Sequence, residues 1–199
     1  NGTDWETLAA SAADFEHTGF FEWALAAVGD EITVYVDGKK VLEVRDCTFS
    51  EGLPAIGGLD CHALFRDVEI MKLEGRVPAA PQPKNNDDSF NRLFHGKNQE
   101  GWIQYGAGIW TINDGVLTGT IHKSGDLARW TTKRHYRDYE LEFEYRMVSG
   151  STGFVFLHTP QMKRRNRNPK RRNPRVFVNF VDNYNYILQK FDEARIVGL

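Results

Sequence analysis

The sequence predicts an all-β protein in which two antiparallel sheets pack face to face as a sandwich. Residues 31–36 alternate apolar and polar side chains and run into an Asp37-Gly38 turn, which is the pattern of a β-hairpin. A second turn of this kind lies at residues 113–115, and the alternation returns along residues 139–146. A chain of 199 residues is an ordinary length for one large sandwich, and such a chain buries roughly 70% of its unfolded surface.

Composition places the chain among folded globular proteins. Apolar residues make up 41% and aromatic residues 13% of the sequence, which excludes a disordered chain. No apolar run approaches the roughly 20 residues of a bilayer-spanning helix, so no membrane span is expected. The two cysteines, Cys47 and Cys61, leave a disulfide and two buried thiols open as alternatives.

Short strands are predicted along the first 75 residues, bounded by glycine and polar turn residues. They are expected at residues 5–10, 20–28, 31–44 as a hairpin, 53–59 and 63–75. Residues 76–87 contain three prolines within six residues and show no periodicity, so they are expected to form an extended, semi-rigid linker.

Beyond the linker, strands are predicted at residues 102–106, 110–121 and 127–132, the second of them as a hairpin. Trp102 and Trp110 begin two of these segments. Core packing is the favoured interpretation of both indoles, and stacking on a sugar is the alternative.

The strand at residues 139–147 carries the clearest chemistry. Alternation puts its four apolar or aromatic residues on the core face and Glu140, Glu142, Glu144 and Arg146 on the opposite face. Same-face side chains on a strand lie about 6.5 to 7 Å apart, close to the carboxylate separation of inverting glycoside hydrolases. Repulsion between the carboxylates would raise the pKa of at least one of them. A solvated outer face with Arg146 as counter-ion is the alternative.

Residues 163–175 are the compositional outlier, because eight of these thirteen residues are basic. The basic residues are Lys163, Arg164, Arg165, Arg167, Lys170, Arg171, Arg172 and Arg175. The remaining chain has 17 basic and 27 acidic residues, so the net charge of −2 conceals a basic loop on an acidic body. This loop predicts a polyanionic partner, foremost an acidic polysaccharide. Nucleic acid is not favoured, because no aromatic side chain interleaves the loop, and an unselective solvated loop or docking on a second copy are alternatives.

Two segments resemble known families, in an unusual order. Residues 63–75 resemble the closing strand of the laminin-G-like and 3-keto-disaccharide hydrolase families. Residues 89–102, with Leu93-Phe94-His95-Gly96-Lys97 and Gly101-Trp102, resemble the opening of the hydrolase family.

This order implies a circularly permuted jelly roll of the concanavalin A-like type. Residues 1–75 would form its C-terminal half, residues 76–87 the linker and residues 88–199 its N-terminal half. Joining Leu199 to Asn1 gives a segment that reads like the uninterrupted middle of a laminin-G-like sheet. Halves of two tandem domains, or exchange of halves between copies, are the alternatives.

The same resemblance suggests two sets of site residues. In the hydrolase family, the strand that corresponds to residues 139–147 ends in Glu-Tyr-Arg. Glu144, Tyr145 and Arg146 match this motif. A hydrolase site would use Glu142 or Glu144 as acid or base, His158 as their partner and Arg146 to orient the substrate. Ser151 and His158 replace the family's Asn and Arg, and its Glu-x-Gln motif is missing. A binding site would instead use Asn179, Asp182, Tyr184 and Tyr186.

These departures fall on sugar-facing positions and favour binding over hydrolysis. The expected function is a carbohydrate-binding or adhesive module that is secreted, periplasmic or at the cell surface. Hydrolysis of 3-keto-glycosides and a structural role in an extracellular assembly are alternatives. No metal cluster or cofactor motif is evident, and a Ca²⁺ ion in a loop at the sandwich edge has no recognisable ligand pattern.

Overall fold

The structure is a computed structural model that describes most of the chain as β-strand. The described residues are 5–12, 19–47, 50–75, 80–81, 90–94, 96–97, 99–121, 127–159, 174–181 and 185–192. Within them lie thirteen strands, paired antiparallel throughout, which confirms the predicted all-β jelly-roll sandwich. None of the described segments forms a helix of the length and apolar character needed to cross a bilayer.

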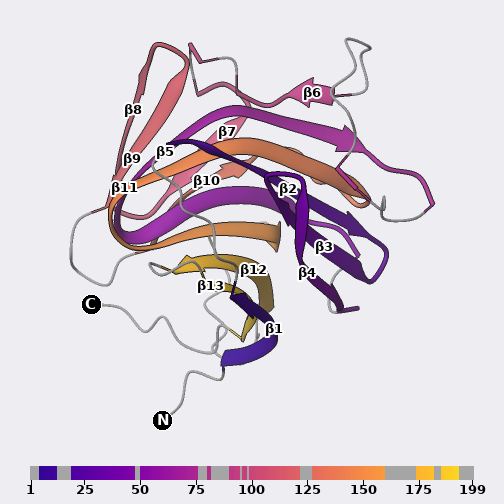
Figure 1. Cartoon of the computed structure of the whole chain (residues 1–199). Helices are drawn as coiled ribbons and strands as arrows, with labels where there is room; N and C mark the ends of the chain where they lie inside the picture. The colour runs from indigo at the N-terminus through magenta and orange to yellow at the C-terminus, as the bar shows by residue number, and fades with distance from the viewer. Residues whose placement is uncertain are drawn as a thin grey trace, which may run out of the picture.

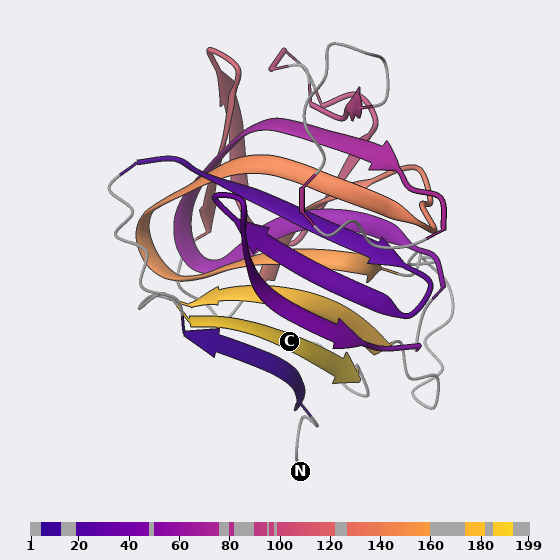
Figure 2. The ribbon, with the colours of Figure 1, turned by 45° about the vertical axis from the view of Figure 1, so that its right-hand side comes forward.

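Two long strands, β5 (Leu53–Lys72) and β11 (Tyr139–Thr159), organise the fold. They pair antiparallel along almost their whole length, with Lys72 opposite Tyr139 and Leu53 opposite Thr159. Both strands curve back on themselves, so that each passes through both layers of the sandwich (Figure 2).

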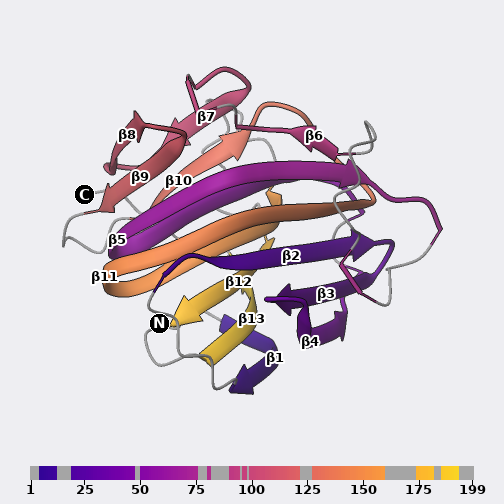
Figure 3. The same ribbon diagram turned by 45° about the horizontal axis from the view of Figure 1, so that its top comes forward.

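The first sheet extends on both sides of the second half of β5 and the first half of β11. On one side, β11 pairs with β2 (Phe21–Val28), and β3 (Glu31–Val36) and β4 (Lys39–Arg45) follow. On the other side, β5 pairs with β6 (Phe90–Arg92) and with β9 (Val116–Ile121), which in turn pairs with β8 (Ile109–Asn113). Figure 3 shows β5, β11, β2 and β3 side by side.

The second sheet uses the other halves of the same two long strands. The first half of β5 pairs with β10 (Leu127–Thr132), and β10 pairs with β7 (Trp102–Tyr105). The second half of β11 continues through β12 (Pro174–Val181) and β13 (Asn185–Asp192) to β1 (Trp5–Ala12). These last three strands form the lower layer of Figure 1.

The sequence predicted two separate strands, at residues 53–59 and 63–75, where the structure has the single bent strand β5, and its predicted strand at residues 139–147 covers only the first part of β11. Gly150 explains the bend in β11, because its φ of 109° is open to glycine but strained for other residues. A Cβ at this position would lie 2.2 Å from the carbonyl oxygen of Asp60 in β5. The two backbones can approach this closely only without a side chain at position 150, and the strands therefore turn together instead of ending.

The core lies between the two sheets and is rich in aromatic rings. The indole of Trp23 stacks on Phe143 with 6.3 Å between the ring centroids. The ring centroid of Trp130 lies 5.7 Å from the ring centroids of both Trp102 and Trp110. Both predicted indoles are buried in this cluster, as the core-packing interpretation expected. Cys61 is a buried free thiol in it, whereas the free thiol of Cys47 is exposed.

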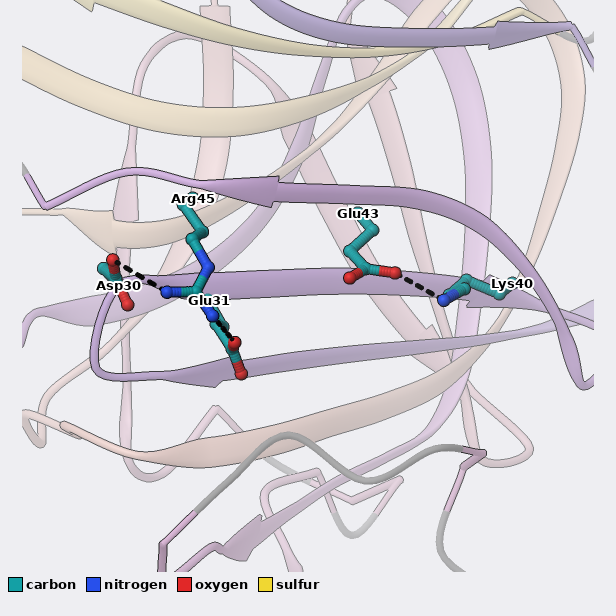
Figure 4. A network of polar contacts seen from close by, with 5 residues as sticks. All are labelled: Asp30, Glu31, Lys40, Glu43 and Arg45. Carbon is teal, nitrogen blue, oxygen red and sulfur yellow. Dashed lines mark hydrogen bonds and ion pairs between the residues drawn. The ribbon is translucent and has the colours of Figure 1, made fainter.

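The predicted hairpin at residues 31–44 is confirmed as β3 and β4. Asp37 and Gly38 connect the strands with φ values of 47° and 74°, the positive pair that a type I′ turn requires. Two ion pairs lie on the surface of this hairpin, one between Lys40 and Glu43 and one between Arg45 and Glu31 (Figure 4).

Residues from both predicted halves of the chain are present in both sheets. Strands β1 to β5 come from residues 1–75 and strands β6 to β13 from residues 88–199. β1 pairs with β13, with Trp5 opposite Phe191. The permuted arrangement and the division into halves stay predictions, and of the predicted linker only residues 80–81 are described.

Candidate functional site

The first half of β11 carries the predicted carboxylates on the face that is turned away from the core. Tyr139, Leu141, Phe143 and Tyr145 are buried in the core, as alternation predicted. Glu140 and Glu142 on the opposite face are only 0% and 1% exposed. The interpretation of this face as a solvated surface is therefore wrong at these two positions. Toward the end of the segment the face does reach solvent, since Glu144 is partly buried and Arg146 is exposed.

Cross-strand pairing gathers more carboxylates on this face. Glu142 lies directly opposite Glu69 in β5 and Ala24 in β2, and Glu144 lies opposite Arg66 and Glu22. Directly opposed residues in an antiparallel pair project to the same face of the sheet. We call the acidic set Glu22, Glu69, Glu140, Glu142 and Glu144 the carboxylate face.

Two arginines neutralise part of the carboxylate face. Nε of Arg66 donates to Oε2 of Glu144 at 2.6 Å, and the same guanidinium lies 4.1 Å above the ring centroid of Phe20. Nε of Arg92 donates to Oε1 of Glu69 at 3.0 Å. The guanidinium of Arg66 therefore engages Glu144, one of the two carboxylates predicted to act as acid or base.

Tyr35 in β3 lies opposite Ala24 in β2, and Ala24 in turn lies opposite Glu142 in β11. Tyr35 and Glu142 therefore project to the same face of the sheet. Burial raises the pKa of its phenol, and the nearby Glu140 carboxylate raises that pKa further, while Lys40 opposes the shift. The hydroxyl therefore stays protonated as a hydrogen-bond donor near neutral pH.

Of the other two predicted catalytic residues, Arg146 stays near the glutamates and position 158 is separated from them. Arg146 lies opposite Leu64, on the same half of β11 as the glutamates. His158 lies beyond the bend, between Phe156 opposite Ala55 and Thr159 opposite Leu53. Position 158 thus belongs to the second sheet, whereas Glu142 and Glu144 belong to the first.

The predicted binding residues fall partly outside the described ranges. Asn179 lies in β12 opposite Phe154, and Tyr186 lies in β13 opposite Phe180. Asp182 and Tyr184 are not among the described residues. The same holds for the basic loop except its last two residues, Pro174 and Arg175, which pair with Asp192 and Phe191 of β13.

A cavity of about 470 Å³, missed by the sequence analysis, opens beside the carboxylate face. We call it the β6–β10 cavity, because segments next to β6, β7 and β10 surround it. Its lining residues are Arg92, Leu93, Lys97, Glu100, Gly101, Trp102, Thr132, Lys133, Arg134 and Tyr136. Arg92 connects it to the carboxylate face, because this arginine binds Glu69, the cross-strand neighbour of Glu142. The volume lies within the range of small-ligand sites.

Basic residues at the ends of predicted strands were the available signal for this cavity. Lys133, Arg134 and His135 directly follow β10, and Lys97 precedes Gly101-Trp102. Among the described residues, no group of three or more His, Cys, Asp or Glu side chains could hold a metal ion.

Comparison with known families gives a match to the second half of the chain. The model of the 3-keto-alpha-glucoside-1,2-lyase-like domain matches residues 89–190. The chain belongs to this family. Its fold is of the concanavalin A-like type, in agreement with the sandwich described above. No curated protein matches the chain.

The part matched to the lyase-like family contains the β6–β10 cavity and part of the carboxylate face. It includes the three acidic residues of β11 and all ten lining residues of the β6–β10 cavity. β5, which supplies Arg66 and Glu69, lies outside the match. This places the chain among carbohydrate-related modules of concanavalin A-like fold.

Proposed function

We propose that this chain is a carbohydrate-binding module that does not hydrolyse its ligand. The burial of Glu142 carries this proposal, because a side chain that is 1% exposed is not placed to reach a glycosidic bond. The ion pair between Glu144 and Arg66 supports it further, since it engages the second carboxylate of the expected pair.

The sugar would bind in the β6–β10 cavity. The cavity combines the half-buried side chain of Leu93 with charged groups around it. Sugar rings have apolar C–H faces and polar hydroxyl edges, so such a lining suits them. The predicted basic loop would add contacts to a longer, acidic chain, and a location outside the cytoplasm fits a module that meets polysaccharides.

Ligand-detected NMR with a panel of neutral and acidic disaccharides tests this proposal. Binding of at least one sugar without release of free monosaccharide is the expected result. Incubation with 3-keto-glucosides runs in parallel, with a Glu142→Gln, Glu144→Gln double variant as the control. Turnover by the wild-type chain that disappears in the variant would overturn the proposal.

Hydrolysis of 3-keto-glycosides is the second candidate. Membership of the lyase-like family favours it, because the match includes Glu142, Glu144 and His158. In that case Glu142 would have to become accessible when substrate binds. Faster amide exchange around Glu142 on addition of substrate, together with turnover that is lost in the Glu142→Gln variant, would then be expected.

A further inference from the structure

The β6–β10 cavity is built before any ligand binds, because backbone hydrogen bonds fix its walls. The amide of Lys133 donates to the carbonyl of Gly101 at 2.8 Å, which joins the end of β10 to the start of β7. Nε1 of Trp102 donates to the carbonyl of Leu93 at 2.7 Å. The amide and carbonyl of Tyr136 both bond to Gly52. A preformed site loses little conformational entropy on binding.

The charge of the cavity is strongly one-sided. Its lining contains four cationic side chains, Arg92, Lys97, Lys133 and Arg134, against one carboxylate, Glu100. Arg92 is already engaged by Glu69 at 3.0 Å and lies 3.8 Å from Asp67. The positive charge that a ligand would meet therefore comes from the other three.

These three cations are available for a ligand. In the described part of the chain, neither Lys97, Lys133 nor Arg134 forms an ion pair with a carboxylate, and all three are exposed. Arg134 lies over the ring of Tyr136, with 5.8 Å between Cζ and the ring centroid. Stacking of this kind orients a guanidinium without occupying its N–H donors.

We propose that the β6–β10 cavity binds an anionic saccharide, with Lys97, Lys133 and Arg134 around its carboxylate or sulfate group. This inference rests on the proposed carbohydrate-binding function and adds the class of ligand and the residues that select it. The sugar ring lies against the half-buried Leu93. Charge-assisted hydrogen bonds from the three cations distinguish an anionic ring from a neutral one of the same shape.

Calorimetric titration with three matched disaccharides tests the proposal. The probes are a glucuronic acid–glucose disaccharide, the uncharged glucose disaccharide with the same linkage, and its 6-sulfated form. Inorganic sulfate alone is the fourth probe. The charged sugars are expected to bind at least about tenfold more tightly than the neutral one, with an advantage that falls as salt is added. Comparing the two charged forms tells which anionic group the site prefers.

Single variants assign the effect to the cavity. Lys97→Met, Lys133→Met and Arg134→Met each keep an apolar chain and remove the charge, and each is expected to reduce the advantage of the charged sugars about three- to tenfold. Lys133→Arg is expected to retain it, which separates loss of charge from loss of folding. Lys39→Met is the matched control, because Lys39 is an exposed lysine of β4, at the far edge of the first sheet.

Each unfavourable outcome has a distinct meaning. Equal affinity for neutral and charged sugars, or unchanged affinity in all three variants, would overturn the anionic site and leave carbohydrate binding intact. Inorganic sulfate that binds as tightly as the charged sugars would reduce the cavity to an unspecific anion site. Absence of binding by every disaccharide would overturn the proposed function together with the inference.

Discussion

The hydroxyl of Tyr139 donates a hydrogen bond to the carbonyl of Leu157, although both residues belong to the same strand. Because β11 bends back, its first residue reaches across the buried interior to a residue near its other end. The bond thus joins the first sheet to the second sheet.

Removing this hydroxyl tests how much the link contributes. Tyr139→Phe keeps the ring, which is 0% exposed, but leaves the Leu157 carbonyl without this donor. We expect the free energy of unfolding to fall by about 1 to 3 kcal/mol, the usual cost of an unsatisfied buried acceptor. Urea unfolding followed by tryptophan fluorescence measures this change, and an unaltered midpoint would show that the bond is not needed.

The bend itself is tested at Gly150. Gly150→Ala would place a Cβ against the Asp60 carbonyl and would also strain a backbone with a φ of 109°. Gly75→Ala is the matched control, since Gly75 also has a positive φ, 92°, but a Cβ there would meet nothing within 4 Å. We expect Gly150→Ala to destabilise the fold by at least about 2 kcal/mol more than the control. Equal losses in thermal unfolding would mean that the close approach can relax.

The ion pair between Arg66 and Glu144 is expected to contribute more than its counterpart on the β3–β4 hairpin. Its side chains are 41% and 27% exposed, whereas those of Lys40 and Glu43 are 52% and 64% exposed and more open to solvent screening. Double-mutant cycles with alanine should give a coupling free energy of about 1 kcal/mol for the first pair and a clearly smaller one for the second. A larger coupling in the hairpin pair would contradict this order.

Stability should decrease in mildly alkaline solution because of Cys61. Burial raises the pKa of its thiol to about 11 from an ordinary value of 9.0. Between these values the unfolded chain releases a proton that the folded chain keeps, so the free energy of unfolding falls as the pH rises. Cys61→Ala should flatten this part of the pH profile in urea titrations at pH 8 to 11.

The two thiols should also differ in reactivity. Iodoacetamide at pH 8 should modify the exposed Cys47 in the native chain and should reach Cys61 only after denaturation. Mass spectrometry of the digested protein distinguishes the two sites. Rapid native modification of Cys61 would show that its surroundings open readily.

Local patterns were enough to predict much of the fold. Alternation at residues 31–36 and the positive φ that Gly38 allows gave the β3–β4 hairpin, and alternation at residues 139–146 gave the correct core face of β11. The continuity of β5 and β11 was not predicted. Glycines at a bend look the same in sequence as glycines at a chain reversal, and only the approach of Gly150 to Asp60 distinguishes the two.

The candidate site was less accessible to sequence reasoning. That Glu140 and Glu142 share a face follows from the strand period, but their burial depends on contacts that no local pattern encodes. The β6–β10 cavity combines Lys97 with Lys133 and Arg134, and it exists only because β7 and β10 pair. Basic residues at strand ends were visible in the sequence, but their positions far apart along the chain did not show that Lys97 lies near Lys133 and Arg134.

The shared long strands have a consequence for the way this protein folds. Since β5 and β11 each belong to both layers, neither layer can be completed while the other is absent. Their pairing joins residues as distant in sequence as Leu53 and Thr159, and such non-local contacts form slowly. The domain should therefore fold slowly and in one cooperative step, without a stable intermediate in which only one sheet is formed.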